Sequence, residues 1–182
     1  AYEMTCEELA AIRRREAGDA AAIIGAELMF LNLPDGELFV DEACRAPLID
    51  AVRQARPDII ITHNPEDYHP DHCNTSALVF SASFLAGAPN VKGLRDLPGH
   101  DRVPSVFYMD TPTGTGFQPT EYVDITPHWE TKVRVIECHA SQVQWIREHD
   151  GLDIVNVARV MAEFRGMQSG VRYAEGFRQL TQ

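Results

Sequence analysis

The sequence predicts an α/β domain built around a mainly parallel sheet. Short apolar runs alternate with segments of helical periodicity in the order strand, helix, strand, helix, strand. Three polar clusters each follow directly after one of the apolar runs. Because ligands of open α/β sheets bind beyond the carboxyl ends of the strands, we expect these clusters to meet at one edge of the sheet.

The N-terminal part of the chain predicts a helix and then a strand. Thr5 followed by Glu8 forms a capping-box pattern ahead of an apolar period, which indicates a helix over 5–24 that ends at Gly25. The run "ELMFLNL" at 27–33 is typical of a buried strand, and the turn residues "PDGE" stop it.

The rest of the chain predicts further strands that alternate with helices. The β-branched run at 58–62 indicates a fully buried strand, and "VPSVFYMD" at 103–110 indicates another. Helices are expected over 41–56 and 72–86, on either side of the first of these strands. Beyond them we expect a short strand at 122–126, helices over 127–149 and 152–168, and a tail of ambiguous structure.

Length, charge and cysteine content restrict the class of protein. The chain has 182 residues, and we expect one domain over 1–182. Its 16 Lys and Arg against 27 Asp and Glu give a formal net charge of −11, which argues against nucleic acid or an anionic membrane as the main partner. The apolar stretches fall short of the roughly 18–20 residues of a membrane span. Four scattered cysteines without a CxxC pair indicate reduced thiols and a cytoplasmic location.

The segment "THNPEDYHPDHCNTS" begins at the end of the strand predicted at 58–62 and contains several histidines and acids. His69 and His72 flank Pro70 and Asp71, and Pro is a favoured first residue of a helix. His72 would then lie in the first turn, with His69 at or just before the cap. Neutral imidazole is the commonest metal ligand, so this pattern is compatible with a zinc site. Asp71 and Asp67 are both candidates to fix the tautomer of a neighbouring histidine.

Plainer interpretations of the same residues stay open. An acidic loop with histidines can be a solvated turn, and the helix dipole alone favours Asp71 near a helix start. We expect His63 to pack or to hydrogen-bond at the strand end, and His139 to lie in the core or behind a ligand. Arg13 lies in a run of three arginines that can form a solvated helix face, and Asp35 is a natural turn former.

Five segments spread over nearly the whole chain form a more specific combination. They are "AAIRRREAGDAAAIIGA", "LMFLNLPDGEL", "PDIIITHNPEDYHPDHCNTS", "YVDITPHWETKVRVIECHASQ" and "YAEGFR". Together they resemble the LmbE-like, or PIG-L, family of zinc-dependent N-deacetylases. The resemblance implies a Rossmann-like three-layer sandwich and a bound zinc ion (Zn2+).

The resemblance also implies roles for single residues. The second histidine of the HPDH motif, here His72, is a zinc ligand in the family. The first histidine, here His69, stabilises or protonates the tetrahedral intermediate, and Asp71 orients it. Arg13 and Asp35 match positions that contact the sugar.

The resemblance further implies removal of an acetyl group from the amide nitrogen of an amino-sugar-containing small molecule, such as a glucosaminide or a glycopeptide-antibiotic sugar. The acidic chain favours a soluble N-acylated amino sugar or glycoconjugate over a lipid, and it is compatible with a homo-oligomer. One segment of the family pattern is missing from the sequence. The family's first strand ends in an A-H-P-D-D-E motif that supplies further zinc ligands and the general base, and we expect this strand and its helix before Ala1.

Two other functions stay open at the level of the sequence. One is a metal-dependent ester or phosphoester hydrolase on a similar scaffold, which would release phosphate or an alcohol instead of acetate from an amide. The other is a degenerate, non-catalytic sugar-binding protein, which would bind zinc poorly. Metal content and a panel of substrates separate these functions from an N-deacetylase.

Overall fold

The computed structural model describes residues 4–181, and its contacts divide the chain into two compact units. The first unit comprises the residues up to Asn32 and Val123–Glu175, and it is mainly helical. The second unit comprises Leu33–Tyr122 and the residues from Gly176 onward. The α/β class predicted from the sequence is confirmed. The single domain expected over 1–182 stays a prediction.

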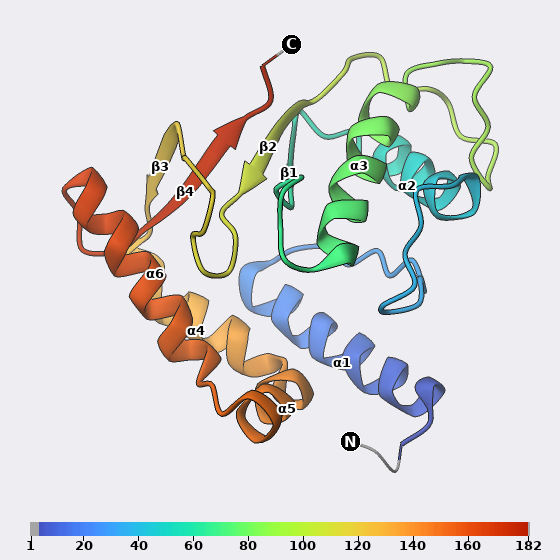
Figure 1. The fold of residues 1–182 in the computed structure, drawn as a ribbon. Coiled ribbons are helices and arrows are strands. Elements are labelled where there is room, and N and C mark those ends of the chain that lie inside the picture. The colour runs from blue at the N-terminus through green and yellow to red at the C-terminus, as the bar shows by residue number, and fades with distance from the viewer. Residues whose placement is uncertain (1–3, 182) are drawn as a thin grey trace. The chain divides into compact units, whose positions relative to one another are not determined.

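Two parallel strands and two helices form most of the second unit (Figure 1). Strand β1 (Ile59–Thr62) pairs in parallel with β2 (Ser105–Met109). The chain passes from β1 through α3 (Pro70–Leu85) before it reaches β2, and α2 (Glu42–Ala55) packs against α3. The core between them consists of Ile49, Val52, Ala82 and Ala86, with Ile60 of β1 packed against it.

Strand β1 is not fully buried, in contrast to the prediction. Ile60 packs into the core, whereas Ile59 and Ile61 are 58% and 55% exposed. β1 forms an edge of the described sheet, and successive side chains of a strand point to opposite faces. The side chains that alternate with Ile60 therefore point away from the core of α2 and α3.

The sheet of residues 4–181 has the strand order β1-β2-β4-β3. Strand β4 (Ala174–Gln179) pairs antiparallel with β2, and β3 (Glu121–Asp124) lies at the other edge. The described sheet is thus mixed, with β1 and β2 as its parallel pair, where the sequence predicted a mainly parallel sheet. Apolar periodicity indicates which residues are buried but not the direction of a strand. The pattern therefore could not predict that β4 pairs antiparallel with β2.

The strand predicted at 27–33 does not form among the described residues. This segment is irregular, and Leu28, Met29 and Phe30 are between 38% and 44% exposed. None of the strands within 4–181 pairs with it. A strand depends on a neighbour for its backbone hydrogen bonds, so apolar character alone does not produce one.

Four helices form most of the first unit. They are α1 (Cys6–Ile24), α4 (Trp129–Cys138), α5 (Ala140–Asp150) and α6 (Ile154–Ser169). α1 packs against α4 and α5, and Trp129 stacks on Tyr173 with ring centroids 4.6 Å apart. The single helix predicted over 127–149 is split, because His139 adopts a non-helical backbone with φ −83° and ψ 52°. Within 4–181, none of the helices has the length and apolarity that a membrane crossing requires.

Helix α1 begins and ends where the sequence predicted. The Thr5 hydroxyl accepts a hydrogen bond from the Glu8 N–H, and the Glu8 carboxylate accepts one from the Thr5 N–H, which completes the capping box. Gly25 closes the helix in the left-handed conformation, with φ 67°.

We expect Thr5→Ala to lower the free energy of unfolding by about 1 kcal/mol, because it removes the cap for the first turn of α1. Thr5→Ser keeps the hydroxyl and serves as the matched control. Urea unfolding followed by circular dichroism measures both variants. Equal losses in the two would show that the hydroxyl does not cap the helix.

Candidate metal centre

The histidine-rich segment forms the loop between β1 and the first turn of α3. His69 is the N-cap of α3, and Pro70 is its first residue, as the sequence predicted. The His69 Nδ1 accepts a hydrogen bond from the backbone N–H of Asp71 at 3.2 Å. Because Nδ1 is an acceptor here, the neutral ring carries its proton on Nε2. A helix cap thus sets the tautomer of His69.

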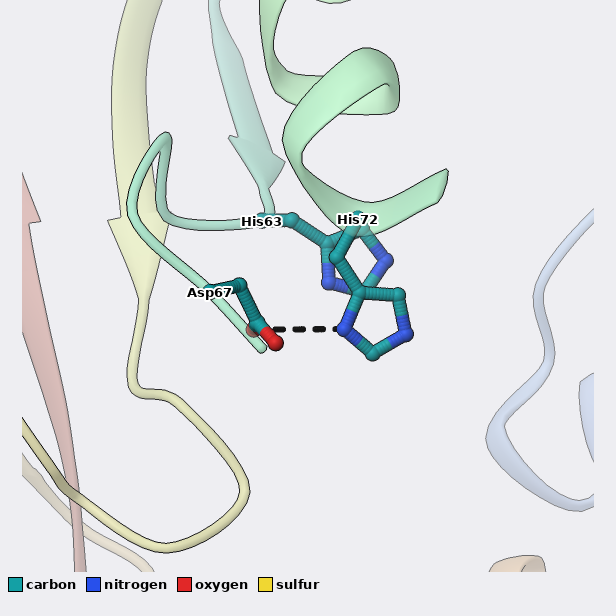
Figure 2. Close-up of side chains that lie close together, drawn as sticks. All are labelled: His63, Asp67 and His72. Atoms are coloured by element: carbon teal, nitrogen blue, oxygen red, sulfur yellow. Dashed lines mark ion pairs between the residues drawn. The ribbon is translucent and has the colours of Figure 1, made fainter. Parts of the chain in front are cut away.

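Three side chains from this region converge on one point (Figure 2). His63 projects from the end of β1, Asp67 from the loop and His72 from the first turn of α3. One potential ligand atom of each lies within 4.8 Å of the other two. The rings of His63 and His72 stack with centroids 4.1 Å apart and an interplanar angle of 8°. His69 stacks on the His72 ring at 4.6 Å, so it borders this group.

The carboxylate of Asp67 contacts both His72 and His69. Its side chain is only 2% exposed, and its Oδ2 atom lies 3.2 Å from Nδ1 of His72. Its Oδ1 atom accepts a hydrogen bond from the backbone N–H of His69 at 3.1 Å. A buried carboxylate is costly unless hydrogen bonds or a positive charge compensate it. The site therefore favours a cation beside Asp67.

The imidazole of His63 is held in its neutral form. Burial lowers the pKa of His63, and the neighbouring His72 ring lowers it further. The Asp67 carboxylate raises the pKa but does not offset these two effects. The neutral ring is the form whose nitrogen lone pair binds metals.

The residues of this group fit a zinc ion. Two imidazoles and one carboxylate are the ligand types that catalytic zinc takes from proteins. The Nδ1 atom of His72 is buried without a hydrogen-bond partner, although Asp67 is close to it. A coordinated cation would satisfy that nitrogen. We refer to His63, Asp67 and His72 as the metal triad.

Asp71 contacts His69 through its backbone N–H, whereas its carboxylate contacts the turn of residues 34–38. The side chain is buried and accepts hydrogen bonds from the backbone N–H groups of Gly36, at 2.6 Å, and Leu38, at 3.4 Å. Asn74 adds a hydrogen bond from its Nδ2 to the Leu38 carbonyl at 2.7 Å. These contacts attach the exposed turn that carries Asp35 to the start of α3. Asp35 thus lies on a turn that is hydrogen-bonded to α3, the helix that carries His72.

Arg13 belongs to the first unit, on α1. Its Nη2 atom donates a hydrogen bond to Oε1 of Gln142 at 2.7 Å. One turn further along α1, the buried Glu16 accepts hydrogen bonds from the backbone N–H and the hydroxyl of Ser141, both at 2.7 Å. These contacts join α1 to the start of α5. The predicted contact between Arg13 and a sugar stays a prediction.

Sequence reasoning did not assign His63 and Asp67 to the metal. It expected His63 to support the strand end and Asp67 to fix a tautomer. The available signal was the position of His63 directly after β1, where the side chain leaves the sheet. Asp67 had no comparable signal, because only the folded loop brings its carboxylate to Nδ1 of the His72 ring.

Several proteins of known sequence or structure resemble this chain. The model of the PIG-L family, described as GlcNAc-PI de-N-acetylase, matches residues 1–83. A diacetylchitobiose deacetylase from Thermococcus kodakarensis is 30% identical over 183 residues, which cover 97% of this chain and 65% of the relative. A 4-oxalmesaconate hydratase from Pseudomonas putida is 30% identical over 141 residues, which cover 77% of this chain and 54% of the relative. The chain therefore spans between about half and two thirds of the length of these relatives.

A solved structure resembles the present fold closely. The N,N'-diacetylchitobiose deacetylase from Pyrococcus horikoshii superposes with a TM-score of 0.79 at 31% identity. The match covers 96% of this chain and 65% of that chain. The fold class expected from the sequence is confirmed by this likeness.

We expect His63→Ala and His72→Ala each to weaken zinc binding by more than about 100-fold. Losing a metal ligand weakens metal binding more than losing a residue that only orients a ligand. His69→Ala should retain zinc, since the ring borders the metal triad without belonging to it. Competition against a chromophoric chelator measures the affinity, with His149→Ala on α5 as control. Unchanged affinity in His63→Ala would remove that residue from the triad.

We expect Asp71→Ala to speed hydrogen exchange at the Gly36 amide by about ten- to a hundredfold. The reason is that a hydrogen bond to a charged group contributes about 1.5–3 kcal/mol. NMR exchange rates measure the effect at single amides. Asp153→Ala, which removes the cap of α6, is the matched control and should leave Gly36 unchanged. Slow Gly36 exchange in Asp71→Ala would show that this carboxylate does not hold the turn.

Proposed function

Because the chain belongs to the PIG-L (LmbE-like) family, we propose that it acts as a zinc-dependent N-deacetylase of an N-acetylated amino sugar. The observation that carries the proposal is the metal triad beside His69 at the start of α3. A ligand set of two imidazoles and one carboxylate supports hydrolysis of an amide, which requires an activated water.

His63, Asp67 and His72 would hold the zinc ion. When bound, zinc lowers the pKa of a coordinated water to about 7 and polarises a carbonyl oxygen. The chain's own residues prepare this role by keeping His63 neutral and by placing the buried Asp67 carboxylate against His72. The neutral imidazole binds the cation without first losing a proton.

His69 would stabilise the oxyanion that forms when water attacks the acetamide carbon. Its Nδ1 accepts the cap hydrogen bond from Asp71, so Nε2–H is the donor that remains for substrate. We therefore assign His69 to hydrogen bonding with the oxyanion through Nε2–H. This role is narrower than the proton transfer that the resemblance also allowed.

The site supports a neutral sugar as substrate. The segment from Thr62 to Ser76 contains no Lys or Arg, and it contributes the carboxylates of Asp67 and Asp71. The two chitobiose deacetylases among the relatives act, by their names, on an acetylated amino sugar. Asp35, on the turn held by Asp71, and Arg13 remain our proposed sugar contacts.

A hydratase is the second candidate function. The 4-oxalmesaconate hydratase reaches the same identity as the Thermococcus kodakarensis deacetylase, although over a shorter stretch. Both reactions add water to an electrophilic carbon, so one metal site could serve either. A carboxylate substrate such as oxalmesaconate needs cationic partners, and the acidic loop of the metal triad supplies none from Thr62 to Ser76.

The resemblance assigns further zinc ligands and the general base to an A-H-P-D-D-E segment, which is not among residues 1–182. We therefore propose turnover for a protein that carries that segment together with residues 1–182. Zinc binding by the metal triad is proposed for the residues described here.

We expect the zinc-loaded protein that carries the A-H-P-D-D-E segment to release acetate from N,N'-diacetylchitobiose. His69→Ala should lower kcat by a factor on the order of 10² to 10³, the typical cost of removing one oxyanion donor. Zinc content measured in the same samples should not change. His149→Ala, on the exposed end of α5, is the control.

Two outcomes would contradict this assignment. Loss of zinc in parallel with activity would make His69 a ligand instead of an oxyanion donor. Conversion of 4-oxalmesaconate without acetate release from the chitobiose would favour the hydratase.

A further inference from the structure

The loop of residues 63–69, which carries two members of the metal triad, is held from within by Asn64. This side chain is 2% exposed, so its polar atoms depend on protein partners. Its Nδ2 atom donates a hydrogen bond to the Glu66 carbonyl at 2.6 Å. Its Oδ1 atom accepts one from Nη2 of Arg178 at 2.8 Å. Asn64 thus links the backbone next to Asp67 to an arginine that is distant in sequence.

Arg178 is itself fixed in place. It lies on β4, opposite Tyr108 of β2 in the antiparallel pair. Its guanidinium lies 5.9 Å from the ring centroid of Tyr108 and 5.4 Å from that of Phe117. Arginine stacks on aromatic faces and presents its donors in a rigid fork, which lysine does not reproduce.

We infer that Arg178 is a positioning residue for the metal triad. It acts through Asn64, which fixes the Glu66 carbonyl and hence the backbone that carries Asp67. The Asp67 carboxylate then reaches both the His69 N–H and the His72 ring. The inference rests on the proposed function in one respect, namely that the triad binds zinc.

The charge of Arg178 and its positioning role predict opposite effects on zinc. Removing a positive charge near a cation site strengthens cation binding by simple electrostatics. Removing a partner that orients a ligand typically weakens metal binding by about 10–100-fold. The sign of the change therefore separates the two roles.

The experiment measures zinc affinity of Arg178→Met, Arg178→Lys and Asn64→Ala by competition with a chromophoric chelator. We expect each variant to bind zinc about 10–100-fold more weakly than the wild type, with Arg178→Lys affected although its charge is kept. The double variant Arg178→Met with Asn64→Ala should bind zinc no more weakly than the single variant with the lower zinc affinity. The reason is that both residues act through one chain of contacts. Arg159→Met, an arginine paired with Glu163 on α6, is the matched control and should bind like the wild type.

Unchanged or tighter zinc binding by Arg178→Met would overturn the inference, as would strictly multiplied losses in the double variant. Circular dichroism checks the fold of each protein, and if Arg178→Met does not fold, the comparison of Arg178→Lys with the wild type decides. A wild type that carries the general base and binds zinc but releases no acetate would sink the proposed function alone. Equal zinc affinity in the wild type and in all variants would sink this inference alone.

Discussion

The contacts of the buried Asp67 carboxylate determine the geometry of the candidate site. One oxygen accepts the His69 N–H at the start of α3, and the other faces the His72 ring. A carboxylate with a side chain only 2% exposed tolerates little displacement, because each lost partner leaves part of a charge without compensation. The loop after β1 and the first turn of α3 must therefore keep their relative position. The proposed metal chemistry depends on that constraint.

The first turn of α3 combines three tasks that proteins often distribute over separate elements. His72 belongs to the metal triad, and His69 caps the helix through its Nδ1 atom. Asp71 and Asn74 hold the turn of residues 34–38, which carries the proposed sugar contact Asp35. The proposed ligand, the proposed oxyanion donor and the proposed sugar contact are thus linked through the start of one helix.

The relatives show that similar sequences carry out deacetylation and hydration. Both reactions add water, which a bound metal can activate, so the metal triad alone does not choose between them. The choice depends on the groups that surround the substrate. In this chain the segment from Thr62 to Ser76 contains acidic residues and no Lys or Arg, which is the reason for proposing an uncharged acetamide as substrate.

The sequence by itself determined the features that depend on neighbours along the chain. Thr5 with Glu8 marked the start of α1, and Pro70 marked the start of α3 with His69 as its cap, because caps are hydrogen bonds between residues a few positions apart. Tertiary structure decided the rest. The strand expected at 27–33 lacks a described partner, and Arg178 meets Asn64 across 114 positions. Strand pairing and such distant contacts exist only after the chain has folded, so no local pattern of residues encodes them.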